Sequence, residues 1–383
     1  GDQIECVRTY FDTDRLPILI RSGYAIVRQE LDRDNHVLSE SFFDTDGQTP
    51  TEKNGYCKVT YEYDTYGNTV HETYYDRNSN RTLGSGGYAE VVREYDAWSY
   101  VVSESYYDVS GEPTACSGGY AGIKNSYDAT GDLIQQSYLG ADGQPTMSAK
   151  GYAVRKLTYD DNRNNIREDF YDAQGNATSA VYRYASVLRS YDDENNLTEE
   201  QYLDESGNPA LSEDGYAVVK KEYDTDGRQI REPYYSTQGE PAVNADGYAS
   251  VVWTYDALGN KLTEAYFNAA QEPTVCADGY AERRLTYDSL SRTTQVSCFD
   301  ADGSPVLSKQ GYAAVCYTYD TQSNVASEQY LDAEGIPVLT QNGYAGIGRQ
   351  YGTGGRLEEI DYYGADGSLI LLKAGYAGYQ NIY

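Results

Sequence analysis

Glutamate and tyrosine recur two residues apart at multiples of 32 residues, a spacing that could support ligand binding. Tyrosine presents an apolar ring face together with a hydroxyl, which suits carbohydrate and peptide ligands. We predict that this row binds a ligand, and the alternative is that the rings stack only to stabilise a thin sheet. The predicted row consists of Tyr74, Tyr106, Tyr138, Tyr202, Tyr234, Tyr266, Tyr330, Tyr362, Glu72, Glu104, Glu200, Glu232 and Glu264.

Few residues suit catalysis. His36 and His71 are the only histidines, and both fall near expected turns or exposed strand faces, so a catalytic triad or a histidine-based metal site is not expected. Paired carboxylates, which a glycosidase needs, are abundant, but the aspartates recur at turn positions whereas an active site should interrupt the repeat. The nearest irregularities are residues 79–86 and 180–184. We predict a protein that is not an enzyme and that has no cofactor and no metal site.

The D-x-D-G segments and the cysteines bear on metal binding and on disulfide formation. The D-x-D-G segments 44–47, 224–227 and 300–303 resemble fragments of calcium loops, but the third oxygen ligand and the distal glutamate of an EF-hand are missing. The six cysteines share no common spacing, and no C-x-x-C occurs, so they predict buried free thiols, with a local disulfide as the alternative.

One repeat positions all of these residues. The tripeptide GYA, or the variants GYC and RYA, begins at residues 23, 55, 87, 119, 151, 183, 215, 247, 279, 311, 343 and 375, always 32 residues apart. Self-similarity at this period is typical of solenoid and array architectures. We therefore predict one array over residues 1–383 rather than separate domains. Positions in the repeat are numbered below from the first residue of GYA.

The residue types predict strands and turns. The chain is rich in Tyr, Val and Thr, holds 37 glycines and shows no sustained helical periodicity. Segments of the form D-x-x-G, such as 64–67 and 256–259, predict type I turns that end in a left-handed glycine and are capped by the aspartate. Proline at position 27 suits an edge or a turn. The predicted fold is all-β, an elongated array of about twelve β-hairpin repeats that form a superhelical, solenoid-like antiparallel sheet.

Alternation along the strands assigns faces. Positions 3, 5, 7 and 9 share one face and predict the core, which places Tyr223 in the core. Position 21 accepts Leu and Phe, as a packing position would, whereas position 20 keeps a hydroxyl, so position 20 with its glutamate is expected on the more accessible face. Stacked glutamates are tolerable only if they are solvated or neutralised by cations. Tyr216, at position 2, is expected on the opposite face from Tyr223, with a hydroxyl bond that clamps adjacent repeats.

The charge excludes some partners. A formal net charge of −30 argues against nucleic acid, which requires a basic stripe, and against an anionic membrane surface. No run of 18 apolar residues occurs, so membrane insertion is not expected. The composition is typical of a secreted or cell-surface protein. Neither end carries a polar cap, so we expect either a segment of a longer protein or terminal repeats that cap themselves.

The segments YEYDTYGN (61–68), WTYDALGN (253–260) and LTYDSLSR (285–292) resemble the tyrosine-aspartate (YD) repeats of RHS and teneurin proteins. The pattern Y-Y-D-x-x-G-x-P also resembles MORN-variant hairpins and, more loosely, the cell-wall-binding repeats of Gram-positive bacteria. The resemblance implies a bacterial extracellular β-repeat protein. This chain departs from it in its strict 32-residue period, in its GYA element and in lacking an RHS core signature.

Together these features predict a non-enzymatic extracellular repeat protein for surface attachment or ligand recognition, with a cell-wall or host carbohydrate or protein as the partner. The alternative is a structural spacer, or an encapsulating shell segment of a larger RHS-like protein, with no ligand of its own. Handedness of the coil and closure of the array are not fixed by the sequence.

Overall fold

The computed structural model describes residues 4–179 and 181–382, and every regular element among them is a strand. In part of the chain before residue 183 the strands are β1 (Ile4–Phe11), β2 (Ile26–Leu31), β3 (Val37–Phe43), β4 (Lys58–Tyr63), β5 (Thr69–Tyr75), β6 (Glu90–Tyr95), β7 (Val101–Tyr107), β8 (Gly122–Tyr127), β9 (Leu133–Leu139), β10 (Val154–Tyr159) and β11 (Asn165–Tyr171). The later strands are β12 (Ser186–Tyr191), β13 (Leu197–Leu203), β14 (Val218–Lys220), β15 (Glu222–Tyr223), β16 (Gln229–Tyr235), β17 (Ser250–Tyr255), β18 (Lys261–Phe267), β19 (Glu282–Tyr287), β20 (Thr293–Phe299), β21 (Ala314–Tyr319), β22 (Val325–Leu331), β23 (Gly346–Tyr351), β24 (Leu357–Tyr363) and β25 (Gly378–Ile382).

Each complete repeat contributes one antiparallel hairpin. In the pair β17–β18, Val251 lies opposite Tyr266 and Trp253 lies opposite Glu264, with a bulge between Thr254 and Tyr255. The second strand of a hairpin then pairs with the first strand of the next repeat, as β18 does with β19. Tyrosine-rich repeating β-hairpins are therefore the building units, as the resemblance implies.

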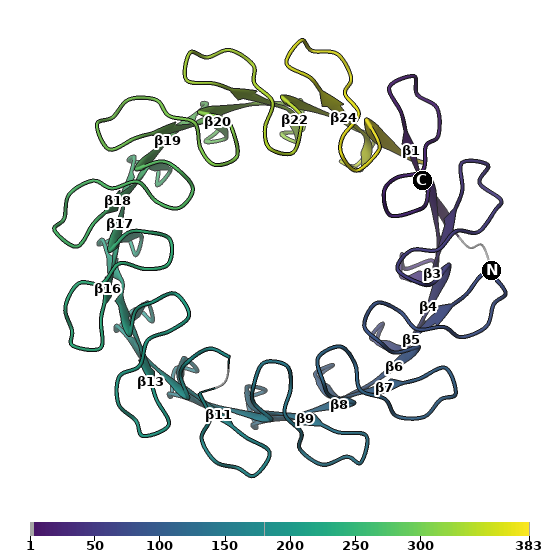
Figure 1. Ribbon diagram of the computed structural model, residues 1–383, viewed down its shortest axis with the longest axis horizontal. Helices are drawn as coiled ribbons and strands as arrows, with labels where there is room; N and C mark the ends of the chain where they lie inside the picture. Colours follow the sequence, from purple (N-terminus) through teal and green to yellow (C-terminus); the bar gives the residue numbers. More distant parts are fainter. Residues whose placement is uncertain (1–3, 180, 383) are drawn as a thin grey trace. The chain divides into compact units, whose positions relative to one another are not determined.

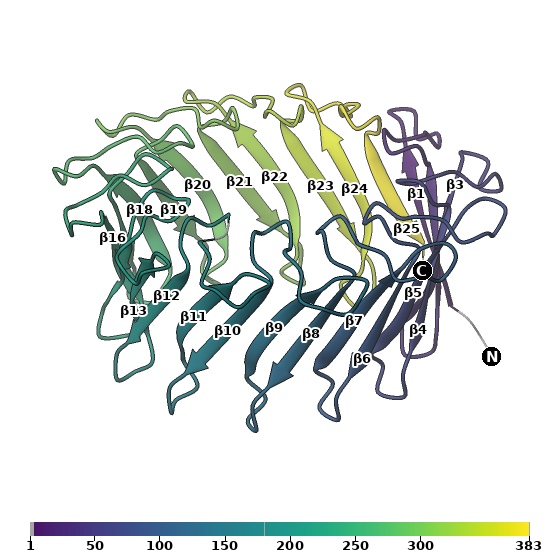
Figure 2. The ribbon, with the colours of Figure 1, turned by 60° about the horizontal axis from the view of Figure 1, so that its bottom comes forward.

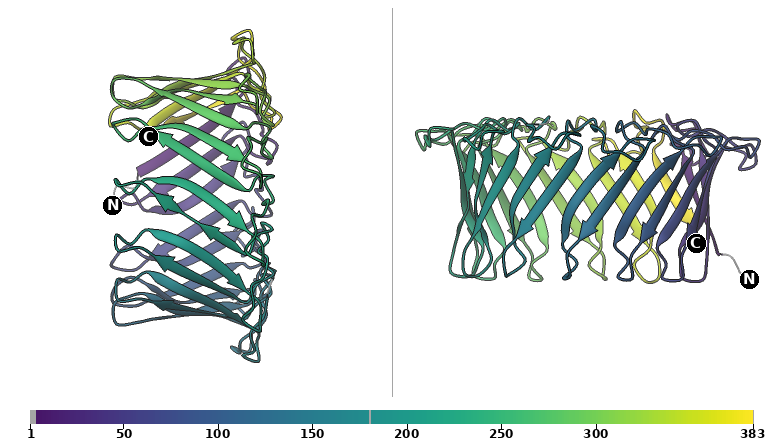
Figure 3. Two further views of the ribbon diagram at one scale, coloured as in Figure 1. Left: turned by 90° about the vertical axis from the view of Figure 1, so that its left-hand side faces the viewer. Right: turned by 90° about the horizontal axis from the view of Figure 1, so that it is seen from below.

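The turns have the chemistry that D-x-x-G predicts. Asp256 Oδ1 accepts hydrogen bonds from the backbone amides of Leu258 and Asn260 at 2.9 and 2.8 Å, and Gly259 has a φ of 86°. A positive φ is costly for residues with a Cβ, which is why glycine recurs there. These turns lie along one edge of the sheet, and the longer loops lie along the other (Figure 3). Proline at position 27 forms an isolated bridge at the loop edge, for example Pro241 with Tyr235.

The described residues form two compact parts. Part I takes in the described residues of Gly1–Thr158, Glu168–Val181 and Ala374–Tyr383, and part II those of Tyr159–Arg167 and Tyr182–Lys373. In part I, neighbouring strands such as β8 and β9 lie side by side (Figure 2). In part II, β17 and β18 likewise lie side by side, with loops on both faces of the sheet (Figure 1).

The first and last strands of the chain pair with each other within part I. β1 is antiparallel to β25, with Val7 opposite Ile382 and Phe11 opposite Gly378, and β1 also pairs with β2. All 25 described strands belong to one sheet. The pairing of β1 with β25 therefore closes the sheet at its ends, and the prediction of an elongated superhelical or solenoid-like array is wrong. Closure satisfies the backbone groups that free edge strands would leave unpaired.

The core lies on one face of the sheet. Ala217 and Val219, at positions 3 and 5, are 0 % and 2 % exposed, which confirms these two positions as core. Val219 lies directly opposite Tyr234, at position 20 of its own repeat, and opposite Glu200 of the preceding repeat. Residues directly opposite each other on paired strands point to the same side. The predicted core stripe and the predicted binding row therefore share one face.

Candidate functional site: the tyrosine ladder

The aromatic rings at positions 2 and 20 form long rows of ring contacts, named here the tyrosine ladder, and Cys298 at position 20 interrupts the row between Tyr280 and Tyr312. In part II the ring centroids of Tyr202 and Tyr216 are 5.8 Å apart, those of Tyr216 and Tyr234 are 4.7 Å apart, and those of Tyr234 and Tyr248 are 5.8 Å apart. Tilted and edge-on contacts at such distances are favourable for aromatic pairs. Tyr216 thus packs between the position-20 rings of two successive repeats.

Part I holds its own stretch of the ladder. Ring contacts of 4.4 to 5.9 Å run from Tyr10 through Phe42 and Tyr106 to Phe170. Tyr10 also contacts Tyr376, at 5.1 Å, so the ladder continues across the pairing of the first and last strands. The stacking that was the alternative to ligand binding is therefore present in the structure.

In five repeats the ladder hydroxyl at position 20 donates to the glutamate two residues earlier. Tyr234 Oη donates to Glu232 Oε1 at 2.5 Å, and Tyr330 Oη donates to Glu328 Oε2 at 2.5 Å. The same bond joins Tyr74 to Glu72, Tyr106 to Glu104 and Tyr266 to Glu264. An ionised acceptor strengthens a hydrogen bond and aligns it. Each such pair therefore fixes the orientation of one ladder ring.

Arginine and lysine neutralise the row of glutamates. Arg93 bridges two repeats, with its Nε 2.6 Å from Glu104 and its Nη2 3.6 Å from Glu72. Arg189 pairs with Glu200 at 2.9 Å, and Lys221 lies 3.7 Å from Glu232. The expectation that stacked glutamates need solvation or cations is met by cations.

Glu264 has the densest set of partners. This 9 % exposed carboxylate accepts from Trp253 Nε1 at 3.1 Å, pairs with Arg283 at 2.9 Å and with Lys261 at 3.3 Å, and accepts the hydroxyl of Tyr266. Burial alone would raise its pKa, but the Tyr266 hydrogen bond and the Arg283 charge together hold that pKa below its usual value. Glu264 is thus a structural anion, held ionised inside the sheet.

Burial favours the protonated hydroxyl at several of the ladder tyrosines. It raises the pKa of Tyr216 and of Tyr120 to about 12. For Tyr106 and Tyr234, burial and the neighbouring glutamate raise the pKa further. A carboxylate that accepts a hydrogen bond from a phenol raises the pKa of that phenol, because ionisation would place two anions side by side.

The structure brings the predicted site residues together, but not on an accessible face. Tyr106, Tyr138, Tyr234 and Tyr266 are 3 to 7 % exposed, while Tyr74, Tyr202, Tyr330 and Tyr362 are half-buried. Of the glutamates, Glu264 is buried and Glu72, Glu104, Glu200 and Glu232 are half-buried. The expectation of an accessible face is wrong, because the GYA tyrosines fold back over these rings. Ligand binding by this row stays a prediction.

The hydroxyl bond that clamps adjacent repeats belongs to position 9. Tyr223 Oη donates to the backbone oxygen of Leu197 at 2.8 Å, and Tyr255 Oη donates to that of Gln229 at 2.8 Å. The same bond spans 26 residues at Tyr63, Tyr95, Tyr127, Tyr191, Tyr287, Tyr319 and Tyr351. Tyr223 is half-buried rather than core, and Tyr216 joins repeats through its ring.

Removing one position-9 hydroxyl should weaken the junction between two repeats. We expect Tyr223→Phe to lower the free energy of unfolding by about 1 kcal/mol, since a typical internal hydrogen bond contributes that much. The matched control is Tyr235→Phe, because phenylalanine occupies position 21 in other repeats, and it should change stability little. Urea denaturation measures both; equal effects would contradict the clamp.

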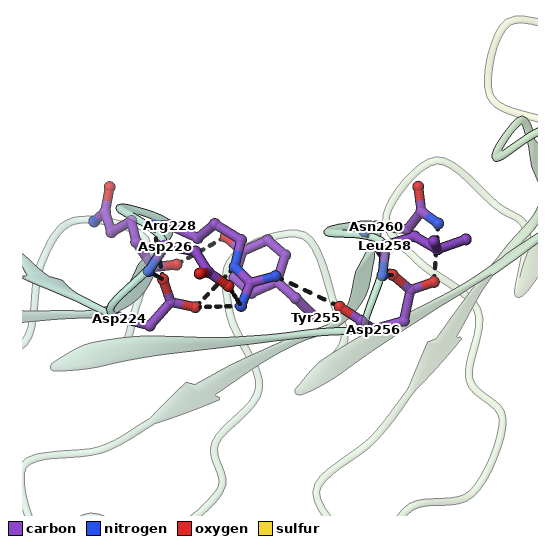
Figure 4. A network of polar contacts seen from close by, with 8 residues as sticks. Asp224, Asp226, Arg228, Tyr255, Asp256, Leu258 and Asn260 are labelled. Atoms are coloured by element: carbon purple, nitrogen blue, oxygen red, sulfur yellow. Dashed lines mark hydrogen bonds and ion pairs between the residues drawn. The ribbon is translucent and has the colours of Figure 1, made fainter.

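A second set of bonds links the hairpin turns. Arg228 Nε donates to Asp224 Oδ2 at 2.7 Å, its Nη2 pairs with Asp226 at 2.8 Å, and its guanidinium carbon lies 5.2 Å from the ring centroid of Tyr255 in the next repeat (Figure 4). In the following turn, Asn260 Nδ2 donates to Asp256 Oδ2 at 2.8 Å (Figure 4). Asp224 and Asp226 belong to the D-x-D-G segment 224–227, which resembles a fragment of a calcium loop. Here these aspartates cap a turn and pair with Arg228.

Metal and thiol chemistry have little support in the described residues. Asp32, Asp34 and His36 place ligand atoms within 4.8 Å of one another on a hairpin turn, and His36 Nδ1 lies 2.8 Å from Asp32 Oδ2. Among residues 4–179 and 181–382, no other three His, Cys, Asp or Glu side chains place their ligand atoms so close together. Five thiols are free, those of Cys57, Cys116, Cys276, Cys298 and Cys316. Burial raises the pKa of Cys298 to about 11, which keeps it an unreactive thiol.

Sequence reasoning missed two features. The cations Arg93, Arg189 and Lys221 all stand at position 7, so their recurrence was a usable signal. An aliphatic row at position 29 escaped notice because those residues lie in loops; its part II members are 42 to 50 % exposed. They are Leu211, Val243, Val275, Leu307, Leu339 and Leu371. The irregular segment 180–184 begins at residue 180, which lies outside the described residues.

Comparisons with known proteins add little. No protein-family model and no curated protein matches the chain. Among solved structures, the chain resembles "Crystal Structure of TcdB2-TccC3-TEV" at 14 % identity, with a TM-score of 0.30, over 88 % of this chain and 20 % of that chain. It also resembles "Crystal Structure of TcdB2-TccC3" at 12 % identity, with a TM-score of 0.28, over 96 % of this chain and 22 % of that chain. The Photorhabdus luminescens Tc holotoxin pore is similar at 13 % identity, with a TM-score of 0.21, over 88 % of this chain and 22 % of that chain.

The chain therefore spans about a fifth of the length of each of these chains. TM-scores of this size do not establish a shared fold, so no property of those toxins is transferred to this protein. None of the described residues forms a helix long and apolar enough to cross a membrane.

Proposed function

We propose that this chain is a non-enzymatic structural protein, a spacer or shell segment whose repeats are joined into a closed sheet. The observation that carries the proposal is the use of the ladder hydroxyls. Tyr234 donates to Glu232, and Tyr266 donates to Glu264, so the groups expected to meet a ligand bind their own strand. A polar group already satisfied inside the protein must break that bond before it binds anything else.

Further rows of bonds between repeats support the same role. The backbone amide of Ala245 donates to Asp214 O at 2.7 Å, that of Ala277 donates to Asp246 O at 2.6 Å, and that of Gln341 donates to Gln310 O at 2.8 Å. With the position-9 hydroxyls and the ladder rings, successive repeats in part II are joined at the loop edge, within the sheet and at the hairpin turns. Such a construction favours rigidity, and the net charge of −30 suits an extracellular location.

A second function, recognition of a protein partner, is favoured by the aliphatic row at position 29. Val243 is 50 % exposed and Val275 is 46 % exposed, and acidic Asp246 and Asp278 follow them in exposed loop segments. Aligned exposed aliphatic side chains with a polar rim are typical of protein interaction surfaces. The partner would meet the loop edge rather than the tyrosine ladder.

Glycan and peptide arrays separate these functions. The wild-type protein is compared with a ladder variant, in which Tyr106, Tyr138, Tyr202 and Tyr234 become Phe, and with a loop variant, Leu211→Ser, Val243→Ser and Val275→Ser. A structural protein gives no array signal, and the ladder variant loses stability. A signal lost only in the loop variant would favour partner recognition, and one lost only in the ladder variant would overturn the structural proposal.

A further inference from the structure

In four repeats a cation from position 6 lies over the aromatic ring at position 21. Lys220 Nζ is 5.6 Å from the ring centroid of Tyr235, and Lys156 Nζ is 4.9 Å from that of Tyr171. The guanidinium carbon of Arg28 lies 5.1 Å from the Phe43 centroid, and that of Arg284 lies 3.9 Å from the Phe299 centroid. Cations within about 6 Å of a ring face are attracted by its quadrupole. This face of the hairpin is thus built to hold a cation against an aromatic ring.

The repeat that begins at Gly343 keeps the ring and supplies no cation of its own from this position. Position 21 is Tyr363, but position 6 is Gly348, and position 4 is Gly346; no other repeat has glycine at both positions. A Cβ on Gly348 would lie 3.0 Å from Tyr363 Cε2, so the ring rests against the bare backbone. Gly364, where most repeats have aspartate, removes a third side chain nearby.

A cavity of about 360 Å³ lies at this place. Its lining includes Gly346 and Gly348 of β23 together with Tyr363, Pro337 and Gln329. The volume is within the range of small-molecule sites, roughly 300–1,000 Å³. The three glycines, which have no side chains, all line this space beside the aromatic ring.

The electrostatics of the cavity suit a cation. No lysine or arginine lines it, although four repeats supply one at the corresponding position. Tyr363 Oη donates to Asp361 Oδ2 at 3.2 Å, and Asp361 is 5 % exposed. A phenol that donates to a carboxylate carries more electron density on its ring, which favours a cation at the ring face.

We propose that this cavity binds a small organic cation, an alkylammonium or a guanidinium, against the ring of Tyr363. The ligand takes the place that the Lys220 ammonium or the Arg284 guanidinium occupies over the equivalent ring of its own repeat. The proposal is independent of the structural role of the ladder, because position 21 and position 20 lie on opposite faces of the strand.

The binding test uses tetramethylammonium and methylguanidinium as free cations and a short peptide with one central lysine as a side-chain cation. The uncharged control is tert-butanol, which is similar in size and shape to tetramethylammonium. Saturation-transfer NMR on the full chain measures each dissociation constant. We expect the cations to bind at least about ten-fold more tightly than tert-butanol, as a cation–π contact implies. Tighter binding of the peptide than of the free cations identifies a side chain as the source of the ligand, and the reverse identifies a free amine. Equal binding of the neutral control overturns the proposal.

Two variants locate the site. Gly348→Lys restores the cation found in other repeats, and Tyr363→Leu places a residue that position 21 accepts at Leu139, Leu203 and Leu331. Each variant should weaken cation binding about ten-fold. The matched control is Val92→Lys, which adds the same charge at position 6 above Tyr107 and should leave binding unchanged. Circular dichroism checks that each variant is folded, and unchanged binding in either folded variant contradicts the site.

Discussion

Replacing Glu264 by alanine is expected to lower the free energy of unfolding by about 1–3 kcal/mol, the usual cost of leaving a buried hydrogen-bond donor without its partner. The substitution leaves Arg283 and Lys261 without their shared carboxylate and leaves the Tyr266 hydroxyl and the Trp253 indole without an acceptor. Urea denaturation followed by circular dichroism measures the loss.

The matched control for this prediction is Glu222→Ala. Glu222 pairs with Arg231 at 3.1 Å, but their side chains are 49 % and 33 % exposed. Exposed pairs contribute about 0–1 kcal/mol, so the control should cost at most that. A loss at Glu264 no larger than the loss at Glu222 would show that the buried carboxylate is not a structural anion.

Stability should fall steeply above about pH 10, the usual pKa of tyrosine. Burial raises the pKa of Tyr216 to about 12 and also raises the pKa values of Tyr74 and Tyr330. A raised pKa means that the folded state holds protons that the unfolded state releases, so the stabilisation is complete below about pH 10 and is lost as the pH rises through the folded-state values.

The size of the alkaline effect follows from the number of such groups. Each withdraws at most about 1.4 kcal/mol for each pH unit above 10, less where solvent screens it. A few groups acting together would cancel the roughly 5–15 kcal/mol margin of a typical domain within two pH units. Urea denaturation at a series of pH values measures this slope, and a flat profile between pH 9 and pH 11 would contradict it.

The sequence predicted the local structure well because local chemistry determines it. The 32-residue hairpins, the aspartate-capped turns at Asp256 and the opposite faces of positions 20 and 21 all follow from turn residues and alternation. The neutralised glutamates followed from Coulomb repulsion between stacked like charges. These features depend on one repeat and its immediate neighbour.

The accessible face was predicted wrongly because a hydroxyl kept at position 20 indicates an internal hydrogen bond as readily as solvent exposure. The face of Tyr216 was predicted wrongly because alternation was extended beyond the strand. β14 begins at Val218, so the two-residue period does not reach Tyr216, whose ring lies over the face of Val219 and Tyr234. The bulge between Glu222 and Tyr223 likewise shifts the register at the other end of the strand. Register between strands was also needed to see that positions 5 and 20 are opposite.

Closure could not be predicted from one repeat. The pairing of β1 with β25 joins residues almost a chain length apart, such as Arg8 and Asn381, whose side chains are 2.8 Å apart. The small twist and bend that each hairpin adds decides whether a sheet meets its own first strand. These angles leave no residue pattern in a repeat whose turns and strands are otherwise regular.

The contacts and burial of the tyrosine ladder make it an internal, protonated part of the sheet rather than an open binding surface. A spectrophotometric titration of tyrosinate on the native protein tests it most directly. We expect the ladder tyrosines to ionise only together with unfolding, so that tyrosinate absorbance and loss of circular dichroism coincide above about pH 10. Ionisation of most tyrosines near pH 10 with the sheet intact would contradict the claim.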